Sequence, residues 1–161
     1  AARTSEVLGA RWAEINLQEA IWLIPAERMK NGQAHRVPLS RDALKLLARV
    51  QTGYNDYVFP SDKFTKPLSN MACLALLKRM DRKDITVHGF RSTFRDWAAE
   101  ETSFSREVAE KALAHSLRSK VEAAYQREDL LEKRKALMEA WAGYCAGDSE
   151  RENKIIQIRV A

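Results

Sequence analysis

Cysteine is scarce in this chain of 161 residues. Its two cysteines, Cys73 and Cys145, lie far apart and form no Cys-x-x-Cys pair, which argues against a zinc site or a disulfide framework. We therefore expect two reduced thiols and a cytoplasmic protein. Long apolar runs are also missing: none approaches the length of a bilayer-spanning helix, and the N-terminus shows no signal peptide. The sequence thus predicts a protein without a membrane segment.

The usual motifs of metal-dependent and nucleotide-dependent chemistry are lacking as well. The three histidines, His35, His88 and His115, show no His-x-x-x-His spacing. No cluster of carboxylates suggests a two-metal nuclease. Neither a Walker loop nor a Gly-x-Gly-x-x-Gly motif is present. We expect no metal and no cofactor.

Positive charge, by contrast, is plentiful. Lys and Arg number 27 against 22 Asp and Glu, which gives a net charge of +5 and a pI near 9.3. The total favours a polyanionic partner only weakly, and the distribution of charge is more informative. Six basic residues between positions 28 and 49 are opposed only by Asp42, and a second basic cluster covers positions 78–83. Each cluster is either a solvated face or a set of phosphate contacts that holds a duplex in register.

Short β-branched and aromatic segments near the N-terminus predict a small antiparallel sheet. Residues 15–25 have the pattern of two strands interrupted by a polar turn, and residues 34–39 that of a third strand, which Pro38 ends. The pair Asn31-Gly32 between them is a strong hairpin signal. It places Lys30 at the tip of the predicted hairpin.

Helical spacing of apolar residues dominates after residue 39, so the predicted fold class is α+β and mainly α. Phe90, Phe94 and Trp97 mark the core-facing stripe of one predicted helix. A β-rich tail at 154–160 predicts one more strand at a sheet edge. The other predicted helices begin after an N-capping serine or at an aspartate: Ser40, Ser69, Ser105 and Asp129.

Side chains suited to attack on a phosphodiester recur along the chain. His88 and Arg91 are three residues apart at the start of a predicted helix, where backbone N–H groups also favour an anion. Guanidinium groups can donate in pairs to non-bridging phosphate oxygens, imidazole and ammonium groups can move protons, and a phenol can act as a nucleophile. Each residue also has an ordinary alternative: a capping or core histidine, or an exposed turn lysine.

The order and spacing of these residues resemble the tyrosine recombinases, and most closely the phage-type integrases. The residues on which the resemblance rests are His88-Gly-Phe-Arg91, then Ala-Leu-Ala-His115, then Tyr125 ten residues later. Upstream, the segment from Ala2 to Leu8 resembles the first-arginine motif of the family, and Lys30-Asn-Gly resembles its hairpin lysine. One departure is Ala114, where many members have glycine.

The resemblance implies a catalytic core of the DNA breaking-rejoining type. It further implies a site-specific recombinase that works through a 3′-phosphotyrosyl intermediate and inserts or excises a mobile element such as a prophage or genomic island. In that role Tyr125 is the expected nucleophile, His88 the base and Lys30 the general acid. The remaining expected residues bind phosphate (Arg3, Arg91, His115), support the first arginine (Glu6) or contact DNA elsewhere (Arg28, Arg36, Arg95).

We expect residues 1–147 to be the catalytic domain, without the family's N-terminal DNA-binding domains and the helix before Arg3. Residues 148–161 are expected to form a tail that packs in cis or onto a neighbouring protomer. The expected partner is double-stranded DNA at recombination core sites, bound by a homotetramer when full length, whereas the fragment is expected to be monomeric. Two other functions remain open: a type IB topoisomerase-like DNA relaxer, and a non-catalytic DNA-binding module.

Overall fold

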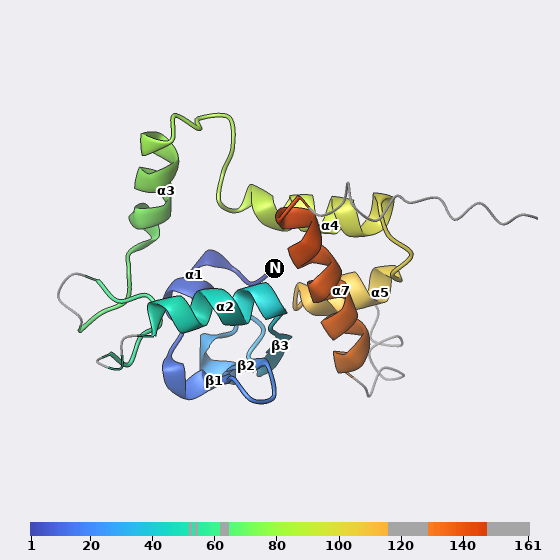
Figure 1. Cartoon of the computed structure of the whole chain (residues 1–161), viewed down its shortest axis with the longest axis horizontal. Helices are drawn as coiled ribbons and strands as arrows, with labels where there is room; N and C mark the ends of the chain where they lie inside the picture. The colour runs from blue at the N-terminus through green and yellow to red at the C-terminus, as the bar shows by residue number, and fades with distance from the viewer. Residues whose placement is uncertain (52, 54, 62–64, 116–128, 148–161) are drawn as a thin grey trace, which may run out of the picture.

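The computed structural model describes residues 1–51, 53, 55–61, 65–115 and 129–147 (Figure 1). Helices dominate this part of the chain, and a three-stranded antiparallel sheet forms near its N-terminal end. The predicted α+β class is therefore confirmed. The predicted strand at 154–160 and the segment with Tyr125 lie outside the described residues. No helix within the described ranges combines the length and the apolar character needed to cross a membrane.

The sheet has the strand order β1 (Ile15–Asn16), β2 (Ile21–Ile24) and β3 (His35–Pro38). Both neighbouring pairs are antiparallel, and Trp22 lies opposite Ile15 on one side and Val37 on the other. Trp22 and Ile24 are buried while Leu23 between them is exposed. This alternation gives the sheet one apolar face, which packs on the core, and one face toward solvent.

The connection between β2 and β3 is longer than the hairpin that the Asn-Gly pair predicts. Residues 25–34 separate the two strands and include a short 3₁₀ helix, η2 (Ala26–Arg28). The Asn31-Gly32 pair still forms a turn: the Asn31 side chain accepts from the Gln33 N–H at 3.2 Å, and Gly32 has φ +65°. Met29 is buried and fixes the base of this turn, and Lys30 directly after it is exposed.

The short α1 (Thr4–Leu8) and the 3₁₀ helix η1 (Trp12–Glu14) precede the sheet, and five helices follow it in the described part of the chain. All three predicted serines occupy N-cap positions, and the Ser40 hydroxyl accepts a hydrogen bond from the Ala43 N–H at 3.3 Å. The helices are α2 (Arg41–Val50), α3 (Asn70–Arg79), α4 (Gly89–Glu100), α5 (Arg106–Ala112) and α7 (Leu131–Cys145).

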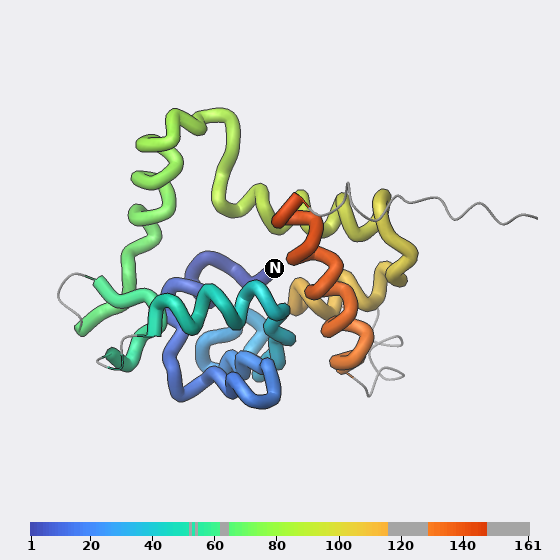
Figure 2. Tube along the Cα trace, viewed as in Figure 1, coloured from blue at the N-terminus to red at the C-terminus, as the bar shows by residue number. Residues whose placement is uncertain are grey.

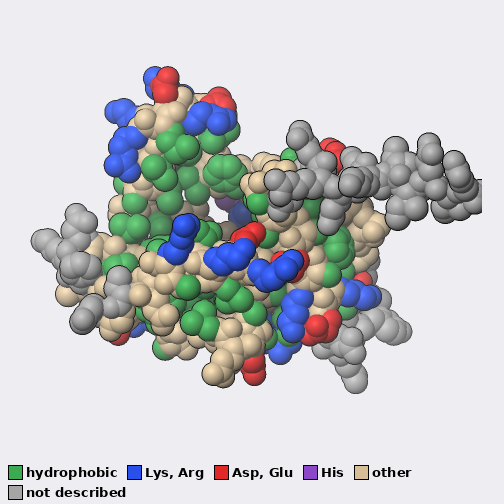
Figure 3. All heavy atoms as spheres, viewed as in Figure 1, with side chains coloured by type: hydrophobic (Ala, Val, Ile, Leu, Met, Phe, Trp, Pro, Cys, Tyr) green, Lys and Arg blue, Asp and Glu red, His purple; other side chains and the backbone are tan. Residues whose placement is uncertain are grey.

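Helix α3 projects from the rest of the molecule (Figures 1 and 2). None of its residues is buried, and Met71, Leu74 and Leu76 are among the exposed large apolar side chains. Lys78 and Arg79 lie in its last turn, where positive charge complements the helix dipole. Figure 3 shows basic side chains at this outer end and apolar ones along the helix below it. The second basic cluster of the sequence is therefore exposed, and its contact with phosphate stays a prediction.

Two groups of buried apolar residues stabilise the fold. The sheet core lies between the sheet and α2, and the helical core lies between α4, α5 and α7. Phe94, Ile24 and Leu137 have no exposed surface at all. The members of the sheet core are Ala10, Trp22, Ile24, Met29, Val37, Leu47 and Val58, and those of the helical core are Phe94, Trp97, Ala98, Val108, Ala109, Ala112, Leu113 and Leu137.

Polar contacts join the sheet to the helical core. Arg134 on α7 is 1% exposed, and it donates to the Arg36 carbonyl of β3 at 2.6 Å and to the Asp129 carbonyl at 2.7 Å. These bonds satisfy a buried guanidinium that would otherwise be costly. They fix β3 against α7. The first two residues touch both cores: Ala1 packs against the helical core and Ala2 against the sheet core.

Candidate active site

A pocket of about 280 Å³ opens between the first residues of the chain, the β2–β3 connection and the α4–α5 pair. It brings together five of the six residues that the sequence predicts to be catalytic. The sixth, Tyr125, lies outside the described residues. Within the described ranges, no three side chains of the metal-ligating types are grouped closely enough to hold an ion. The lining residues are Arg3, Lys30, His88, Arg91, Ser92, Arg95, Leu113 and His115.

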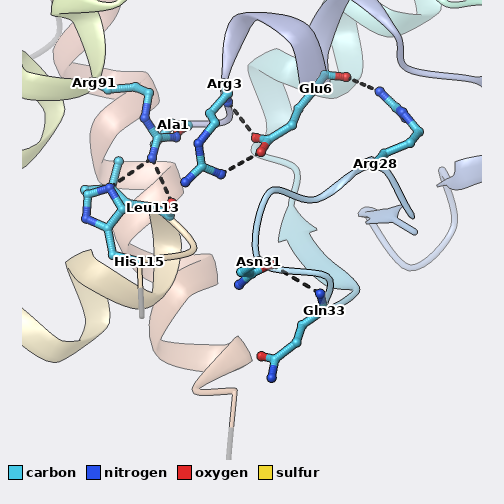
Figure 4. Close-up of polar contacts among 9 residues, drawn as sticks. All are labelled: Ala1, Arg3, Glu6, Arg28, Asn31, Gln33, Arg91, Leu113 and His115. Atoms are coloured by element: carbon cyan, nitrogen blue, oxygen red, sulfur yellow. Dashed lines mark hydrogen bonds and ion pairs between the residues drawn. The ribbon is translucent and has the colours of Figure 1, made fainter. Parts of the chain in front are cut away.

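Arg3 enters the pocket from the start of α1, where it occupies the N-cap position. Its side chain donates to one Glu6 carboxylate oxygen at 2.7 Å, and its backbone N–H donates to the other at 2.6 Å (Figure 4). Glu6 is only 3% exposed, so this pair is shielded from water on the carboxylate side. The predicted contact between Glu6 and Arg3 is thus present, and it orients the guanidinium toward the pocket.

Arg91 reaches the pocket from the first turn of α4. It lies three residues before the fully buried Phe94, so the helix register holds it against the core. One terminal nitrogen donates to the Ala1 carbonyl, and the other donates to the Leu113 carbonyl at 2.8 Å and lies 3.2 Å from His115 Nε2. Figure 4 shows the guanidinium groups of Arg91 and Arg3 turned toward the same space.

The electrostatics of this space favour an anion. Burial lowers the pKa of Arg91, and repulsion from the neighbouring Arg3 lowers it further. Both effects arise because positive charge is held close together in a partly desolvated position. An anion placed between the two guanidinium groups would relieve both. Their planar, forked donors match the geometry of phosphate oxygens.

His115 is placed by the way in which helix α5 ends. The His115 N–H donates to the Glu110 carbonyl at 3.0 Å, and the Ala114 N–H donates to the Lys111 carbonyl at 3.1 Å. This pair of bonds is the Schellman pattern, which requires a left-handed residue after the helix. That residue is Ala114, with φ 51°. Glycine adopts this conformation more readily than alanine, so Ala114 is held in a strained backbone conformation.

His88 and Lys30 lie at the exposed margin of the pocket. His88 is the N-cap residue of α4, and its carbonyl accepts from the Arg91 N–H at 3.0 Å. Lys30 follows the buried Met29 at the turn of the β2–β3 connection. Among the described residues, neither side chain has an ion-pair partner. Both are therefore free to meet a ligand in the pocket.

Three arginines are predicted from the sequence to contact DNA. Each forms an ion pair with a carboxylate of the same chain. Arg28 is the most internal, because it pairs with Glu14 and donates to the Glu6 carbonyl at 2.5 Å (Figure 4). Arg36 pairs with Asp129 at 2.8 Å and Arg95 with Glu110 at 3.0 Å, and both side chains remain 46% exposed. Contact with DNA stays a prediction for all three.

Sequence reasoning missed three parts of this site. Ser92 lines the pocket, and the Leu113 carbonyl accepts a hydrogen bond from Arg91 there. The Glu110 carboxylate accepts from His115 and Arg95. Ser92 adjoins Arg91, so its position was a usable signal. No signal in the sequence marked Glu110, because its contact with His115 forms only where the chain turns back at the end of α5.

Comparison with known proteins identifies the family. Residues 1–131 match the Phage integrase family, so the chain belongs to that family. It is 40% identical over 144 residues to Prophage integrase IntA of Escherichia coli (strain K12), an alignment that covers 87% of this chain and 35% of that protein. It is 39% identical to Prophage integrase IntZ of the same strain, over 88% of this chain and 36% of that protein.

A phage protein is also among the relatives. The Integrase of Enterobacteria phage P4 is 33% identical over 177 residues, which covers 98% of this chain and 40% of that protein. The chain therefore spans little more than a third of the length of the curated relatives that it matches. No solved structure matches it significantly.

Proposed function

We propose that this protein is the catalytic part of a site-specific DNA recombinase, which breaks and rejoins DNA strands through a 3′-phosphotyrosyl intermediate. The observation that carries the proposal is the pocket shared by Arg3, Lys30, His88, Arg91 and His115. Membership of the Phage integrase family supports it, as do relatives named integrase and prophage integrase. Those names also support the insertion or excision of a mobile element as the biological outcome.

The proposed reaction is a transesterification at phosphorus. The phenol oxygen of Tyr125 attacks the phosphorus of one strand and gives its proton to His88. The bond from phosphorus to the 5′ oxygen breaks, and that oxygen takes a proton from Lys30. The products are a tyrosine ester of the 3′ phosphate and a free 5′ hydroxyl. Attack by a 5′ hydroxyl of another strand reverses each step, so no nucleotide, metal or oxidant is consumed.

The cations of the pocket have the task of stabilising the transition state. Negative charge on the non-bridging oxygens grows as the phenol attacks, and Arg3, Arg91 and His115 are placed to donate to them. Glu6 holds Arg3 and the Leu113 carbonyl holds Arg91 before any DNA arrives. Donors that are already oriented need not reorganise during the reaction, and each is worth about 10²–10³ in rate.

The resemblance to the family supports a proposal for the larger assembly. We propose that residues 1–147 are the catalytic domain and that residues 148–161 are a tail that packs in cis or in trans. The full-length protein would act as a homotetramer on paired core sites of duplex DNA, and this chain alone would be a monomer that binds DNA weakly. Arg28, Arg36 and Arg95 are proposed to add contacts to the DNA backbone, which position the duplex without reading its sequence.

The test of the proposal is a covalent protein–DNA adduct. The chain is incubated with nicked duplexes that carry a randomised core, so that a cut strand loses the fragment needed for rejoining. Adducts that survive denaturation are digested, and the DNA-linked peptide is sequenced. The expected result is attachment at Tyr125, abolished by Tyr125→Phe with little loss of DNA affinity, because one hydroxyl contributes little beside the phosphate contacts.

The outcomes separate the competing functions. Binding of the same duplexes without any adduct, or an adduct on another residue, would contradict the proposed chemistry and favour a DNA-binding module. An adduct at Tyr125 together with relaxation of a supercoiled plasmid, but without exchange between two sites by the full-length protein, would favour a topoisomerase-like relaxer. Exchange between two sites supports the recombinase.

A further inference from the structure

We infer that Glu110 is a positioning residue for the reaction, and that it holds His115 with Nε2 turned toward the phosphate pocket. The inference rests on the proposed function, because His115 is taken there to donate to the phosphate. The underlying contact is a property of the structure alone. The two can therefore be tested separately.

Glu110 binds His115 at two points. Its carboxylate oxygen Oε2 lies 2.6 Å from His115 Nδ1, and its carbonyl oxygen accepts the His115 backbone N–H at 3.0 Å. Glu110 is 9% exposed, whereas the His115 side chain is 41% exposed. A buried carboxylate thus fixes both the backbone and the ring of a histidine that faces solvent.

The carboxylate is itself fixed from two helices. Its other oxygen, Oε1, accepts from Arg95 Nε on α4 at 3.0 Å, and Arg106 Nε on α5 lies 3.9 Å away. Burial alone would raise the pKa of Glu110, but the hydrogen bonds from His115 and Arg95 outweigh it and lower the pKa. The group is therefore an ionised carboxylate, which accepts hydrogen bonds and donates none.

These contacts determine the tautomer of His115. An arginine nitrogen can only donate, so the Arg91 nitrogen at 3.2 Å requires His115 Nε2 to accept. A neutral imidazole with an acceptor at Nε2 carries its proton on Nδ1, and that proton points at Glu110. The opposite tautomer would set an N–H against a guanidinium and a ring lone pair against a carboxylate. Only one assignment satisfies both sides of the ring.

The same arrangement prepares the ring to act as a donor. Once a phosphate lies between Arg3 and Arg91, its oxygens can take the Arg91 donors and leave Nε2 to face the anion. A ring with protons on both nitrogens would donate from Nε2 to the phosphate and from Nδ1 to the Glu110 carboxylate. Among the described residues, the other charged groups that line the pocket or pair with Glu110 are cations, from α4 (Arg91, Arg95), α5 (Arg106) and the pocket margin (Arg3, Lys30).

The first experiment tests the contact without DNA. Nitrogen-15 imidazole spectra of the 161-residue chain, assigned with a His115→Asn variant, report which nitrogen carries the proton. The expected result is the Nδ1–H tautomer for His115, changing to a mixture in Glu110→Gln. A wild-type His115 in the Nε2–H form would overturn the inference whatever the chain does to DNA.

The second experiment tests the role in the reaction. Glu110→Gln is expected to slow single-turnover formation of the adduct by about 10–100-fold, the range found when the partner of a metal-binding histidine is removed, with DNA affinity unchanged. Glutamine cannot accept from His115 and Arg95 at once without turning its amide N–H₂ toward one of these donors. Glu110→Asp keeps the charge and should recover part of the rate.

Controls separate positioning from a structural effect. Glu107→Gln removes a carboxylate from the same helix that has no ion-pair partner among the described residues, and it should match the wild type. In a His115→Ala background Glu110→Gln should cause no further loss, because the two act as a unit. Full additivity, or a Glu110→Gln rate equal to that of Glu107→Gln, would overturn the inference. A wild-type chain that binds DNA but forms no adduct would instead overturn the proposed function.

Discussion

The two sides of the pocket are built in opposite ways. On the helical side, Arg91 is 9% exposed and bonds two backbone carbonyls, and His115 is fixed by Glu110. On the hairpin side, Lys30 is exposed on a turn whose anchor is the buried Met29. A group that stabilises charge gains from being fixed in advance, whereas a group that delivers a proton to a leaving atom gains from reach. The difference in construction therefore matches the difference in proposed roles.

The contrast begins in the sequence. The α4 stripe that buries Phe94 also holds Arg91 against the core, and the fully packed Leu113 precedes the turn that presents His115. Between Met29 and His35 there is no buried residue. A segment with few buried contacts opens at low free-energy cost, so the hairpin side is the one expected to move when DNA binds.

Loss of Arg91 should have the largest effect on both function and stability. Arg91→Ala removes a guanidinium with two donors for the phosphate and leaves the Leu113 carbonyl without that partner. We expect adduct formation to fall by about 10³-fold or more, and the unfolding free energy to fall by about 1–3 kcal/mol. Single-turnover cleavage and urea denaturation measure the two effects.

Arg3→Ala supplies the comparison for Arg91→Ala. It should cost a similar factor in rate, because both arginines face the same anion site. Arg91→Lys keeps the charge but loses the fork, so it should recover stability better than rate. If Arg91→Ala cleaved DNA at a rate within tenfold of the wild-type rate, the helical side would not be the side that binds the phosphate.

Loss of Lys30 should affect the rate alone. Lys30→Ala removes the proposed general acid from an exposed turn, so we expect cleavage to slow by about 10²–10³-fold with no change in Tm. A substrate with sulfur in place of the bridging 5′ oxygen releases a thiolate, which needs no proton donor because thiols are far more acidic than alcohols. That substrate should restore the rate of Lys30→Ala to near that of the wild type.

Gln33→Ala on the same turn is the matched control for Lys30. It should cleave both substrates at the wild-type rate. If Lys30→Ala stays slow on the sulfur substrate, Lys30 has another role, such as binding the phosphate. The hairpin side would then be a second binding surface rather than the source of a proton.

Acid should lower the unfolding free energy of the chain through His35. His35 on β3 has its pKa lowered to about 4, first by burial and then by the neighbouring Arg134. Below a pH of about 6.5 the unfolded chain takes up a proton that the folded chain refuses until about pH 4. Stability should therefore fall by up to about 3 kcal/mol as pH drops through this window, and this contribution should level off below it.

A His35→Gln variant tests that assignment. Glutamine stays neutral at every pH, so unfolding curves from pH 4 to 7 should lose this part of their slope, whatever the variant does to stability at pH 7. An unchanged slope would mean that another group causes the acid sensitivity. The Ala1 amino group, whose pKa is lowered to about 6 first by burial and then by Arg91, is the nearest rival in this pH range.

The features that the sequence predicts correctly are those with a signal close by in the chain. Strand alternation, the serine N-caps and the Asn-Gly turn all depend on residues close in the chain, and each appears where it was expected. The pocket residues were found because motif spacing and the family resemblance together mark them. What the spacing could not supply is the distance between Arg3 and Arg91, which depends on how the two cores meet.

The missed features depend on long-range geometry or on competing interactions. Glu110 was missed because a carboxylate inside a helix usually faces solvent, and nothing nearby in the sequence announces Arg95 above it. The long β2–β3 connection was missed because η2 satisfies its own backbone bonds before the Asn-Gly turn begins. The intrachain partners of Arg28 were equally invisible, since Glu14 is brought near only by the sheet.

The smallest predicted effects form a matched pair, one on each side of the pocket. Ala114 has φ 51° and Gly32 has φ +65°, and a left-handed conformation costs an L-residue about 1–2 kcal/mol. Ala114→Gly should relieve that strain, less about 0.4–1 kcal/mol for the freer unfolded chain, and so stabilise the protein by up to about 1 kcal/mol. Gly32→Ala should destabilise it by a similar amount through the backbone alone, because no atom lies within 4 Å of the added Cβ.

Thermal unfolding of both variants measures the pair, and the tautomer of His115 should be the same in each. Destabilisation by Ala114→Gly would mean that packing rather than backbone strain decides the end of α5, and that His115 is held less by the helix end than by the residues around its ring. Stabilisation by Gly32→Ala would mean that the loss of freedom in the unfolded chain outweighs the backbone strain at that turn.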